Sequence, residues 1–389
     1  MDLSPLSSDG SNGGSRPFVL GLLAALLAQP EPHELHLLVK PDAEGVVSLL
    51  QARGARVHLL GAPGGVSEPR RLARTRQRLV RPARAMLDPI IPAGRSLRAL
   101  GVDTLFSPLG TAAFHESGLA HVAVAYDFQE LDHPDFFTPA ERRRRRAFRA
   151  DLRRCQRVAA ISRVTARAGV DRVGLRPERV QVIAPVTKAI APLPDGEVAR
   201  RLAALGLSEK GFVAYPANFW PHKNHRRLLE AVALLSPHAG DPFRLVLSGA
   251  DATGRNAIGA LIQSLGVGSA VTLLPYLADA DLVAVLQGSR ALVFPSLYEG
   301  FGLPVLEAFQ LGTPVGCSSL PALEELAHDA ALFFPPHDTG QIAGALERLW
   351  TDGALRARLR SQGSARVAND DLQSNIDAFH ALLGASGSP

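Results

Sequence analysis

The chain has 389 residues, 46% hydrophobic and 20% charged, which is enough for two domains with buried cores and excludes an intrinsically disordered chain. Its formal net charge of +5 comes mainly from arginine and suits anionic ligands, but it is too small, without an arginine–aromatic motif, to indicate a nucleic-acid partner. The two cysteines, Cys155 and Cys317, are isolated in sequence, which excludes a disulfide framework and favours a reducing cytoplasm.

The chain opens with a short apolar stretch, a glycine-containing loop at residues 7–15 and an apolar run at residues 18–28. The apolar run is too short to span a bilayer and lacks a basic segment before it, so we predict a buried helix in a soluble or peripheral protein. A doubly wound sheet normally begins with a strand before its first glycine loop, and only residues 1–5 are available for one here. We therefore expect either that this strand is truncated or that the true start lies upstream.

Short apolar runs then alternate with helical stretches along the whole chain. This alternation predicts an α/β fold with doubly wound parallel sheets covered on both faces. A proline-rich stretch at residues 185–197 marks a boundary between two domains, 1–190 and 191–371, followed by a final helix and a loose tail over 372–389. The predicted strands are residues 36–39, 57–60, 104–106, 121–125, 157–161, 180–183, 212–215, 244–248, 271–274, 291–294, 314–316 and 331–334.

The most informative segment begins with the predicted strand at residues 291–294. A turn follows from Ser296 to Gly302, and Pro304 stands where the first turn of a helix tolerates proline. Free backbone N–H groups and the positive end of the helix dipole make such a loop an anion site, usually for phosphate. Glu299 on the loop and Glu307 in the helix add carboxylates that suit sugar hydroxyls. A plain structural turn is the alternative interpretation.

The string that contains Glu299 and Glu307, continuing through Gly312-Thr313-Pro314-Val315, resembles the E-x7-E signature of retaining glycosyltransferases of family 4. The resemblance implies the GT-B fold, in which two Rossmann-like domains face a cleft and the last helix, within residues 372–389, crosses back to the first domain. It also implies that a hexose moves from a nucleotide-diphosphate sugar to an acceptor hydroxyl of a glycan or lipid-linked saccharide, with retention, no cofactor and no metal. Many such enzymes are mannosyltransferases of polysaccharide biosynthesis.

The same resemblance implies roles for individual residues of this segment. Glu307 is expected to bind the donor ribose, and Glu299 to contact sugar hydroxyls as a catalytic residue. The loop backbone is expected to hold the sugar or diphosphate through Gly300, Phe301, Gly302 and Leu303.

A second segment, residues 217–225, follows the first predicted strand of the second domain and resembles the family's donor-phosphate loop. Lys223 matches the family's lysine, and its compact charge would neutralise the departing diphosphate. Asn218 stands where many members have arginine, so it offers a hydrogen bond but no charge. Gly249, at the end of another strand, resembles a wall of the nucleotide pocket. The alternative is a solvated helix-entry turn.

In the first domain, Tyr126 and Asp127 follow a predicted strand and resemble the family's His-Asp loop, which contacts the donor sugar. Asp127 matches and is expected to be catalytic. Tyr126, which replaces the histidine, is expected to bind the donor, and it offers a hydroxyl but no positive charge near neutral pH. A packed aromatic is the alternative for Tyr126. Gly13 and Gly14 lie in the loop that, in the family, faces the donor phosphates and the acceptor, and consecutive glycines let a backbone approach a ligand closely.

A basic helical stretch runs from Glu141 to Arg154. Such a run of charges usually forms a solvent-exposed helix face. The alternative is that this stretch docks the protein peripherally at the anionic inner face of a membrane.

Two other functions stay open for the whole chain. One is a nucleotide-sugar epimerase of the same fold, and the other is a catalytically weak subunit that binds sugar nucleotide.

Overall fold

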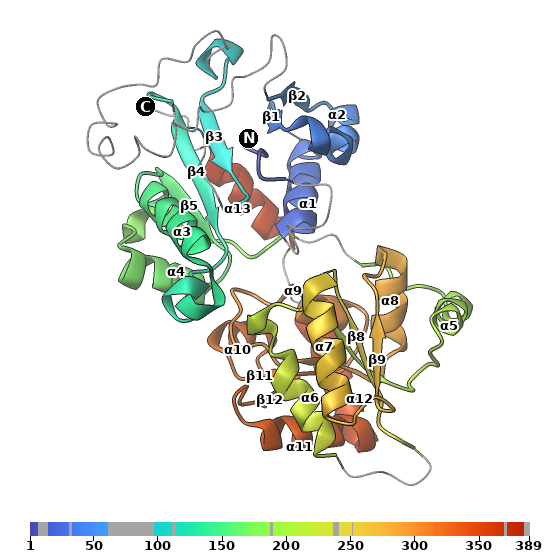
Figure 1. Cartoon of the computed structure of the whole chain (residues 1–389). Helices are drawn as coiled ribbons and strands as arrows, with labels where there is room; N and C mark the ends of the chain where they lie inside the picture. The colour runs from blue at the N-terminus through green and yellow to red at the C-terminus, as the bar shows by residue number, and fades with distance from the viewer. Residues whose placement is uncertain are drawn as a thin grey trace. The chain divides into compact units, whose positions relative to one another are not determined.

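The computed structural model describes residues 1–6, 15–30, 33–60, 97–110, 114, 116–186, 190–235, 241–250, 252–368 and 372–384. The chain divides into two compact units, which are treated separately below (Figure 1). Unit 1 comprises Met1–Glu130, Phe137–Lys188 and Leu372–Pro389, and unit 2 comprises Leu131–Phe136 and Ala189–Asp371. The last helix, α13 (Leu372–Gly384), therefore belongs to unit 1 although it follows unit 2 in sequence.

Unit 1 is an α/β unit whose strands are all parallel. Two strands form one sheet in the order β1-β2, and four form another in the order β3-β4-β5-β6. The strands are β1 (His36–Val39), β2 (Arg56–Leu59), β3 (Thr104–Ser107), β4 (Ala120–Ala125), β5 (Arg157–Ala160) and β6 (Val180–Val182). The helices, besides α13, are α1 (Ser15–Leu27), α2 (Ser48–Ala52), α3 (Pro139–Leu152) and α4 (Arg163–Ala168).

Residues Met1–Leu3 lie between these two sheets of unit 1 and pair with both. The Leu38 N–H donates to the Met1 carbonyl (2.9 Å), and the Leu3 N–H donates to the Leu38 carbonyl (3.0 Å). On the other side, the Asp2 N–H donates to the Phe106 carbonyl (2.8 Å). This short segment thus takes the place in the sheet order that the first strand of a doubly wound domain occupies.

The apolar run near the N-terminus forms α1, as predicted, and its apolar side chains are buried: Phe18, Val19, Leu22, Leu23 and Leu26. Phe18 packs against Phe379 of α13, with ring centroids 6.0 Å apart, so the first and last helices share one core. Among the described residues, no helix combines the length and apolar character needed to cross a membrane.

Unit 2 contains one six-stranded parallel sheet in the order β12-β11-β10-β7-β8-β9. Numbered within the unit, this is the 3-2-1-4-5-6 order of a classical doubly wound domain, read from the other edge. The strands are β7 (Val213–Pro216), β8 (Leu245–Ser248), β9 (Val271–Leu274), β10 (Ala291–Phe294), β11 (Val315–Ser318) and β12 (Ala331–Phe334). The helices are α5 (Asp195–Ala204), α6 (His225–Ala233), α7 (Ala252–Ser264), α8 (Asp279–Gly288), α9 (Leu303–Gln310), α10 (Pro321–Ala327), α11 (Thr339–Thr351) and α12 (Gly353–Ala368).

Alternate residues of β7 and β8 belong to two different cores, as the period of two in a strand requires. Ala214 of β7 and Val246 of β8 pack with α5 and α8 on one face. Their neighbours Val213 and Tyr215 of β7 belong to the larger core on the other face, which includes residues of α6, α9 and α11. Both faces of the sheet are therefore covered by helices.

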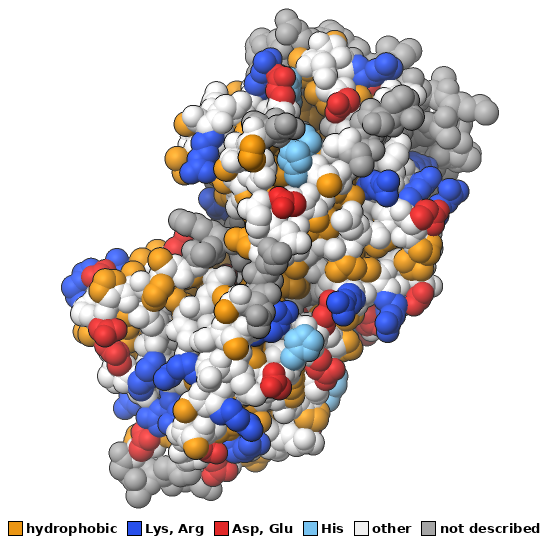
Figure 2. All heavy atoms as spheres, turned by 180° about the vertical axis from the view of Figure 1, so that it is seen from behind, with side chains coloured by type: hydrophobic (Ala, Val, Ile, Leu, Met, Phe, Trp, Pro, Cys, Tyr) orange, Lys and Arg blue, Asp and Glu red, His pale blue; other side chains and the backbone are white. Residues whose placement is uncertain are grey.

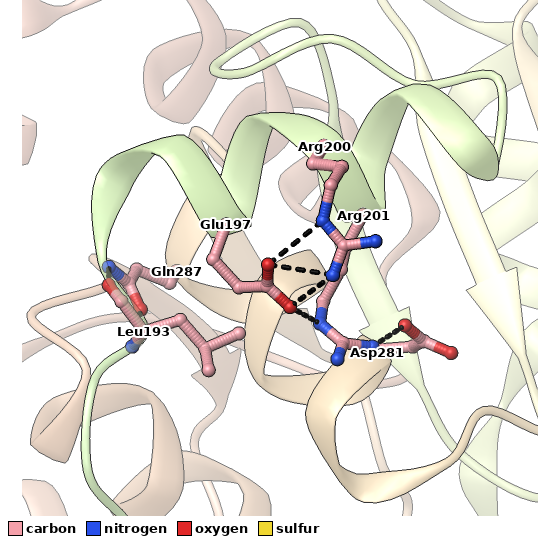
Figure 3. A network of polar contacts seen from close by, with 6 residues as sticks. All are labelled: Leu193, Glu197, Arg200, Arg201, Asp281 and Gln287. Carbon is pink, nitrogen blue, oxygen red and sulfur yellow. Dashed lines mark hydrogen bonds and ion pairs between the residues drawn. The ribbon is translucent and has the colours of Figure 1, made fainter.

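Polar contacts fix α5 to α8 (Figure 3). Arg201 of α5 donates to the Glu197 carboxylate (2.6 Å) and to the Asp281 carboxylate of α8 (2.7 Å). The Leu193 backbone and the Gln287 side-chain amide exchange two hydrogen bonds of 2.9 Å, so the chain entering unit 2 is held at α8. On the face shown in Figure 2, basic and acidic side chains are interspersed, in keeping with the modest net charge.

Candidate active site

Parallel strands of a doubly wound sheet bind ligands beyond their carboxyl ends, at the point where the strand order reverses. In unit 2 this point lies between β7 and β10, which pair through Ala291 with Val213 and Leu292 with Ala214. The loop after β7 carries Lys223, and the loop after β10 carries Glu299. The topology therefore brings the two predicted loops to the same place, although they are far apart in sequence.

Hydrogen bonds from one backbone N–H group and from one side-chain amide hold these loops together. The Leu297 N–H donates to the His222 carbonyl at 2.7 Å. The Asn224 side-chain amide donates to the Pro295 carbonyl at 2.9 Å and to the Pro336 carbonyl at 2.8 Å. Asn224 is buried and has a left-handed backbone (φ 58°), which asparagine tolerates better than most residues.

The two predicted catalytic side chains of unit 2 form an ion pair. Lys223 Nζ lies 2.6 Å from Glu299 Oε1, and the side chains are only 14% and 12% exposed. The ammonium group also lies 5.1 Å from the centroid of the Phe294 ring. A charge-assisted hydrogen bond of this length in a partly dehydrated setting holds both groups in defined positions. The pair thus presents a cation and a carboxylate side by side.

The loop after Glu299 leads into α9 with its backbone donors unused. Gly302 caps the helix in a left-handed conformation (φ 114°), and Pro304 stands in the first turn, as predicted. The backbone N–H groups of residues 300–303 make no hydrogen bond to any other residue in the part of the chain that the structure describes. Consecutive free N–H groups at a helix N-terminus form a cradle for an anion such as phosphate.

Glu307 lies on α9 behind this cradle and is half-buried. Burial, together with the nearby Asp279 carboxylate, raises the pKa of its carboxyl group to about 7. Near neutral pH this group therefore exists in both forms, and its ionised form is a hydrogen-bond acceptor for hydroxyl groups.

Asn218 and Gly249 join the loop after β7 to the loop after β8. Asn218 Oδ1 accepts a hydrogen bond from the Ala250 N–H at 2.9 Å. A Cβ atom at Gly249 would come within 2.5 Å of the Ala217 carbonyl oxygen, so only glycine fits there. Asn218 is thus engaged in shaping the loop, and it brings no charge to it.

The residues predicted in the first domain lie in unit 1 and are engaged in its packing. The Tyr126 hydroxyl donates to the Pro108 carbonyl at 2.6 Å, and its ring meets the edge of Phe18. Burial raises the pKa of Tyr126 well above its usual value. Asp127 accepts hydrogen bonds from the Gln129 N–H (3.0 Å) and from Arg145 (2.8 Å). Gly13 and Gly14 lie outside the described residues.

The sequence analysis did not single out three residues that contribute to the site of unit 2. Tyr215 looks like an ordinary buried strand residue, yet its hydroxyl donates to the Lys223 carbonyl at 2.7 Å. Asn224 directly follows Lys223, and this position next to a predicted site residue could have indicated it from the sequence. His225 packs between Tyr215 and Phe219, and burial, followed by the Lys223 charge, lowers its pKa to about 3, so it is neutral.

Comparison with known proteins agrees with this arrangement. Residues 44–186 match the family model for Glycosyltransferase Family 4, and residues 202–366 match that for Glycosyl transferases group 1. Both models describe glycosyltransferases, and together they span most of the chain, so the resemblance predicted from the sequence is confirmed.

Curated relatives include mannosyltransferases. The chain is 33% identical over 161 residues to the O-antigen chain mannosyltransferase B of Escherichia coli, a match that covers 41% of this chain and 42% of the relative. It is 34% identical over 204 residues to the D-inositol 3-phosphate glycosyltransferase of Acidothermus cellulolyticus, covering 50% of this chain and 45% of the relative. The chain thus spans less than half the length of either relative.

Solved structures match nearly the whole fold. Anabaena Alr3699/HepE, solved in complex with UDP and glucose, has a TM-score of 0.73 at 18% identity and 98% coverage of both chains. WaaG, a glycosyltransferase involved in lipopolysaccharide biosynthesis, has a TM-score of 0.68 at 18% identity, covering 95% of this chain and 96% of WaaG. These likenesses show the fold, and the predicted GT-B class is confirmed.

Proposed function

We propose that this protein transfers a hexose from a nucleotide-diphosphate sugar to a hydroxyl of a glycan or lipid-linked saccharide, with retention of anomeric configuration. One observation carries the proposal. The Lys223–Glu299 ion pair, 2.6 Å long, stands at the carboxyl edge of the sheet beside the free N–H groups of residues 300–303. Such an arrangement offers a cation, an anion cradle and a carboxylate to one ligand.

Each part suits one portion of a sugar nucleotide. The N–H groups at the start of α9 suit the diphosphate, because the helix dipole and free donors favour anions. Lys223 suits the oxygen on which negative charge grows as the sugar–phosphate bond breaks, where a preorganised cation is most effective. Glu299 suits the sugar hydroxyls, and Glu307, deeper in α9, suits the ribose hydroxyls.

We further propose that the reaction needs no metal ion, since Lys223 supplies the positive charge that a divalent cation supplies in other transferases. Turnover that persists in EDTA supports this part, and turnover restored only by Mg²⁺ or Mn²⁺ contradicts it. Retention is checked separately, by the anomeric signal of the product in proton NMR. An inverted product contradicts the retaining assignment while leaving the transferase assignment intact.

The relatives guide the choice of substrates. Two of them are named as a mannosyltransferase of O-antigen chains and a glycosyltransferase of inositol 3-phosphate, so mannose is the first sugar to test and a saccharide the first acceptor. Solved structures of similar fold contain UDP, so a uridine nucleotide belongs in the same panel.

The deciding experiment is calorimetric binding of UDP, GDP and ADP sugars, followed by turnover assays with the donor that binds. Glu307→Ala is expected to weaken nucleotide binding, and Glu299→Ala to lower turnover more than binding. Glu209→Ala, at an exposed carboxylate elsewhere in unit 2, serves as the matched control. Full activity in both site variants would refute the assignment.

The assays also separate the two other functions. A nucleotide-sugar epimerase of this fold would convert the donor sugar without any acceptor. A catalytically weak binding subunit would bind one nucleotide through Glu307 yet transfer sugar to no acceptor. The neutral Asn218, whose side-chain oxygen is already occupied by the Ala250 N–H, keeps this last function open.

A further inference from the structure

Tyr215 is a buried polar residue beneath the proposed catalytic pair. It stands on β7, and its side chain is 0% exposed. A phenol this deeply buried costs free energy unless its hydroxyl finds a partner. Phenylalanine would fill the same space without that cost, so the hydroxyl group itself calls for an explanation.

The partner of this hydroxyl is the main chain of the catalytic lysine. Tyr215 OH donates to the Lys223 carbonyl oxygen at 2.7 Å. Lys223 ends a single 3-10 turn, η8 (Pro221–Lys223), and the left-handed Asn224 follows it. A turn this short has little stability of its own, so an outside hydrogen bond to its last residue has a large influence on its position.

The tyrosine ring is itself held firmly. It packs edge-on against Phe294 of β10 (centroids 5.9 Å apart) and lies 4.8 Å from the His225 ring. Phe294 also lies beneath the Lys223 ammonium group, 5.1 Å from Nζ. Contacts therefore hold Lys223 in place at both ends. Tyr215 binds its carbonyl group, and Glu299 and Phe294 contact its ammonium group.

The protonation state of the phenol suits this task. Burial raises the pKa of Tyr215 well above its usual value, and the Glu299 charge raises it further. The hydroxyl consequently keeps its proton near neutral pH, so it stays a hydrogen-bond donor to the Lys223 carbonyl.

We propose that Tyr215 is a positioning residue, which holds the Lys223 backbone so that its ammonium group stays at Glu299 and at the departing diphosphate. This inference rests on the proposed function and deepens it. Tyr215 touches no substrate, and all of its effect on turnover passes through Lys223.

A double-mutant cycle tests this dependence. Tyr215→Phe removes the hydroxyl and keeps the ring, so we expect kcat to fall about tenfold while the donor KM changes less than about twofold. In the Lys223→Ala background the same change is expected to have no further effect on kcat, because the group that it positions is gone. An equal loss in both backgrounds, or no loss in the wild type, would overturn the proposal.

Controls separate positioning from general damage. Tyr276→Phe removes a hydroxyl from a tyrosine of unit 2 that is 65% exposed, and it is expected to leave kcat unchanged. Calorimetric titration with the nucleotide diphosphate counts the competent sites in each preparation, so that kcat refers to folded protein. A Tyr276→Phe loss equal to that of Tyr215→Phe would contradict a specific role.

If no pair of donor and acceptor gives turnover, the proposed function is refuted, but the positioning role of Tyr215 can still be tested by a measurement that does not depend on activity. The chain has four lysines, so the acylation rate of Lys223 by an amine-reactive reagent is readily followed in a peptide map. We expect Tyr215→Phe to speed labelling of Lys223 severalfold, with Lys210 as internal reference. Identical Lys223 rates in the two proteins would overturn the inference.

Discussion

The Asn224 side-chain amide donates a hydrogen bond to the main-chain carbonyl of Pro295 at 2.9 Å. Pro295 directly follows β10, and Asn224 lies on the loop after β7; these two strands meet where the strand order of unit 2 reverses. The bond therefore links the loop that carries Lys223 to the loop that carries Glu299. Because both partners are buried, water cannot replace the bond when it is lost.

Asn224→Ala is expected to destabilise unit 2 by about 3 kcal/mol, since it removes two buried hydrogen bonds and places alanine in a left-handed conformation that asparagine tolerates better. Asn224→Gly keeps that backbone conformation accessible and is expected to cost about 2 kcal/mol. Both tryptophans, Trp220 and Trp350, lie in unit 2, so their fluorescence follows its unfolding in urea. Equal midpoints for the wild type and both variants would show that the link contributes nothing.

The positions of the strands along the chain and the E-x7-E segment were within reach of sequence reasoning. All twelve predicted strands correspond to strands of the structure, with ends within two residues, because each is a short apolar run between helix or turn signals. The anion cradle was also readable, since Gly302 and Pro304 are local signals of a helix start.

The partners of the site residues were not readable, because they come from distant parts of the chain. Tyr215 has the pattern of a core residue, and only the fold places its hydroxyl at Lys223. Asp127 matches a family motif, yet its carboxylate is bound by Arg145, eighteen residues further on. No local pattern distinguishes such an engaged carboxylate from a free one.

The raised pKa of Glu307 predicts a pH dependence of both stability and binding. The folded chain retains the proton on this group up to about pH 7, whereas an unperturbed glutamate loses it near 4.5. The contribution to stability therefore declines as the pH rises from about 4.5 to about 7, by at most about 1.4 kcal/mol per pH unit. Glu307→Gln is expected to remove this decline in urea unfolding curves.

Nucleotide affinity is expected to move in the opposite direction. Ribose hydroxyls donate to a carboxylate, so UDP or GDP affinity is expected to rise between pH 6 and pH 8 as Glu307 ionises. Calorimetry of wild type and Glu307→Gln, compared at each pH, cancels the titration of the nucleotide phosphate. Parallel pH profiles for the two proteins would exclude Glu307 from the binding site.

The basic helix α3 offers a test of membrane docking. Arg145 and Arg149 are engaged with Asp127 and Glu130, whereas Arg142, Arg143, Arg144 and Arg146 are exposed. If the exposed arginines bind anionic headgroups, replacing all four with alanine is expected to weaken binding by a few kcal/mol, at about 1 kcal/mol per charge.

Co-sedimentation with vesicles of graded anionic lipid content measures this effect. The matched control replaces four exposed arginines elsewhere in the chain: Arg53, Arg176, Arg348 and Arg358. An equal loss of vesicle binding in both variants would show that binding depends on the net charge of the protein and not on α3. Binding that ignored the anionic lipid content would leave α3 as a solvated face.

Gly302 is the residue on which the anion cradle depends most directly. Its φ of 114° is unfavourable for residues with a side chain, and an added Cβ would come within 2.5 Å of Leu323 Cδ2. Gly302→Ala is therefore expected to shift the start of α9 and turn the free N–H groups of residues 300–303 away from a bound diphosphate. We expect nucleotide affinity to fall at least tenfold, measured by calorimetry.

Gly344 provides the matched control for this substitution. It lies inside α11, where an added Cβ meets nothing within 4 Å and the helical backbone suits alanine. Gly344→Ala is expected to keep full nucleotide affinity and to stabilise unit 2 slightly, by up to about 1 kcal/mol. If Gly302→Ala bound nucleotide as tightly as Gly344→Ala, the diphosphate would have to lie away from the start of α9, and the cradle would lose its proposed role.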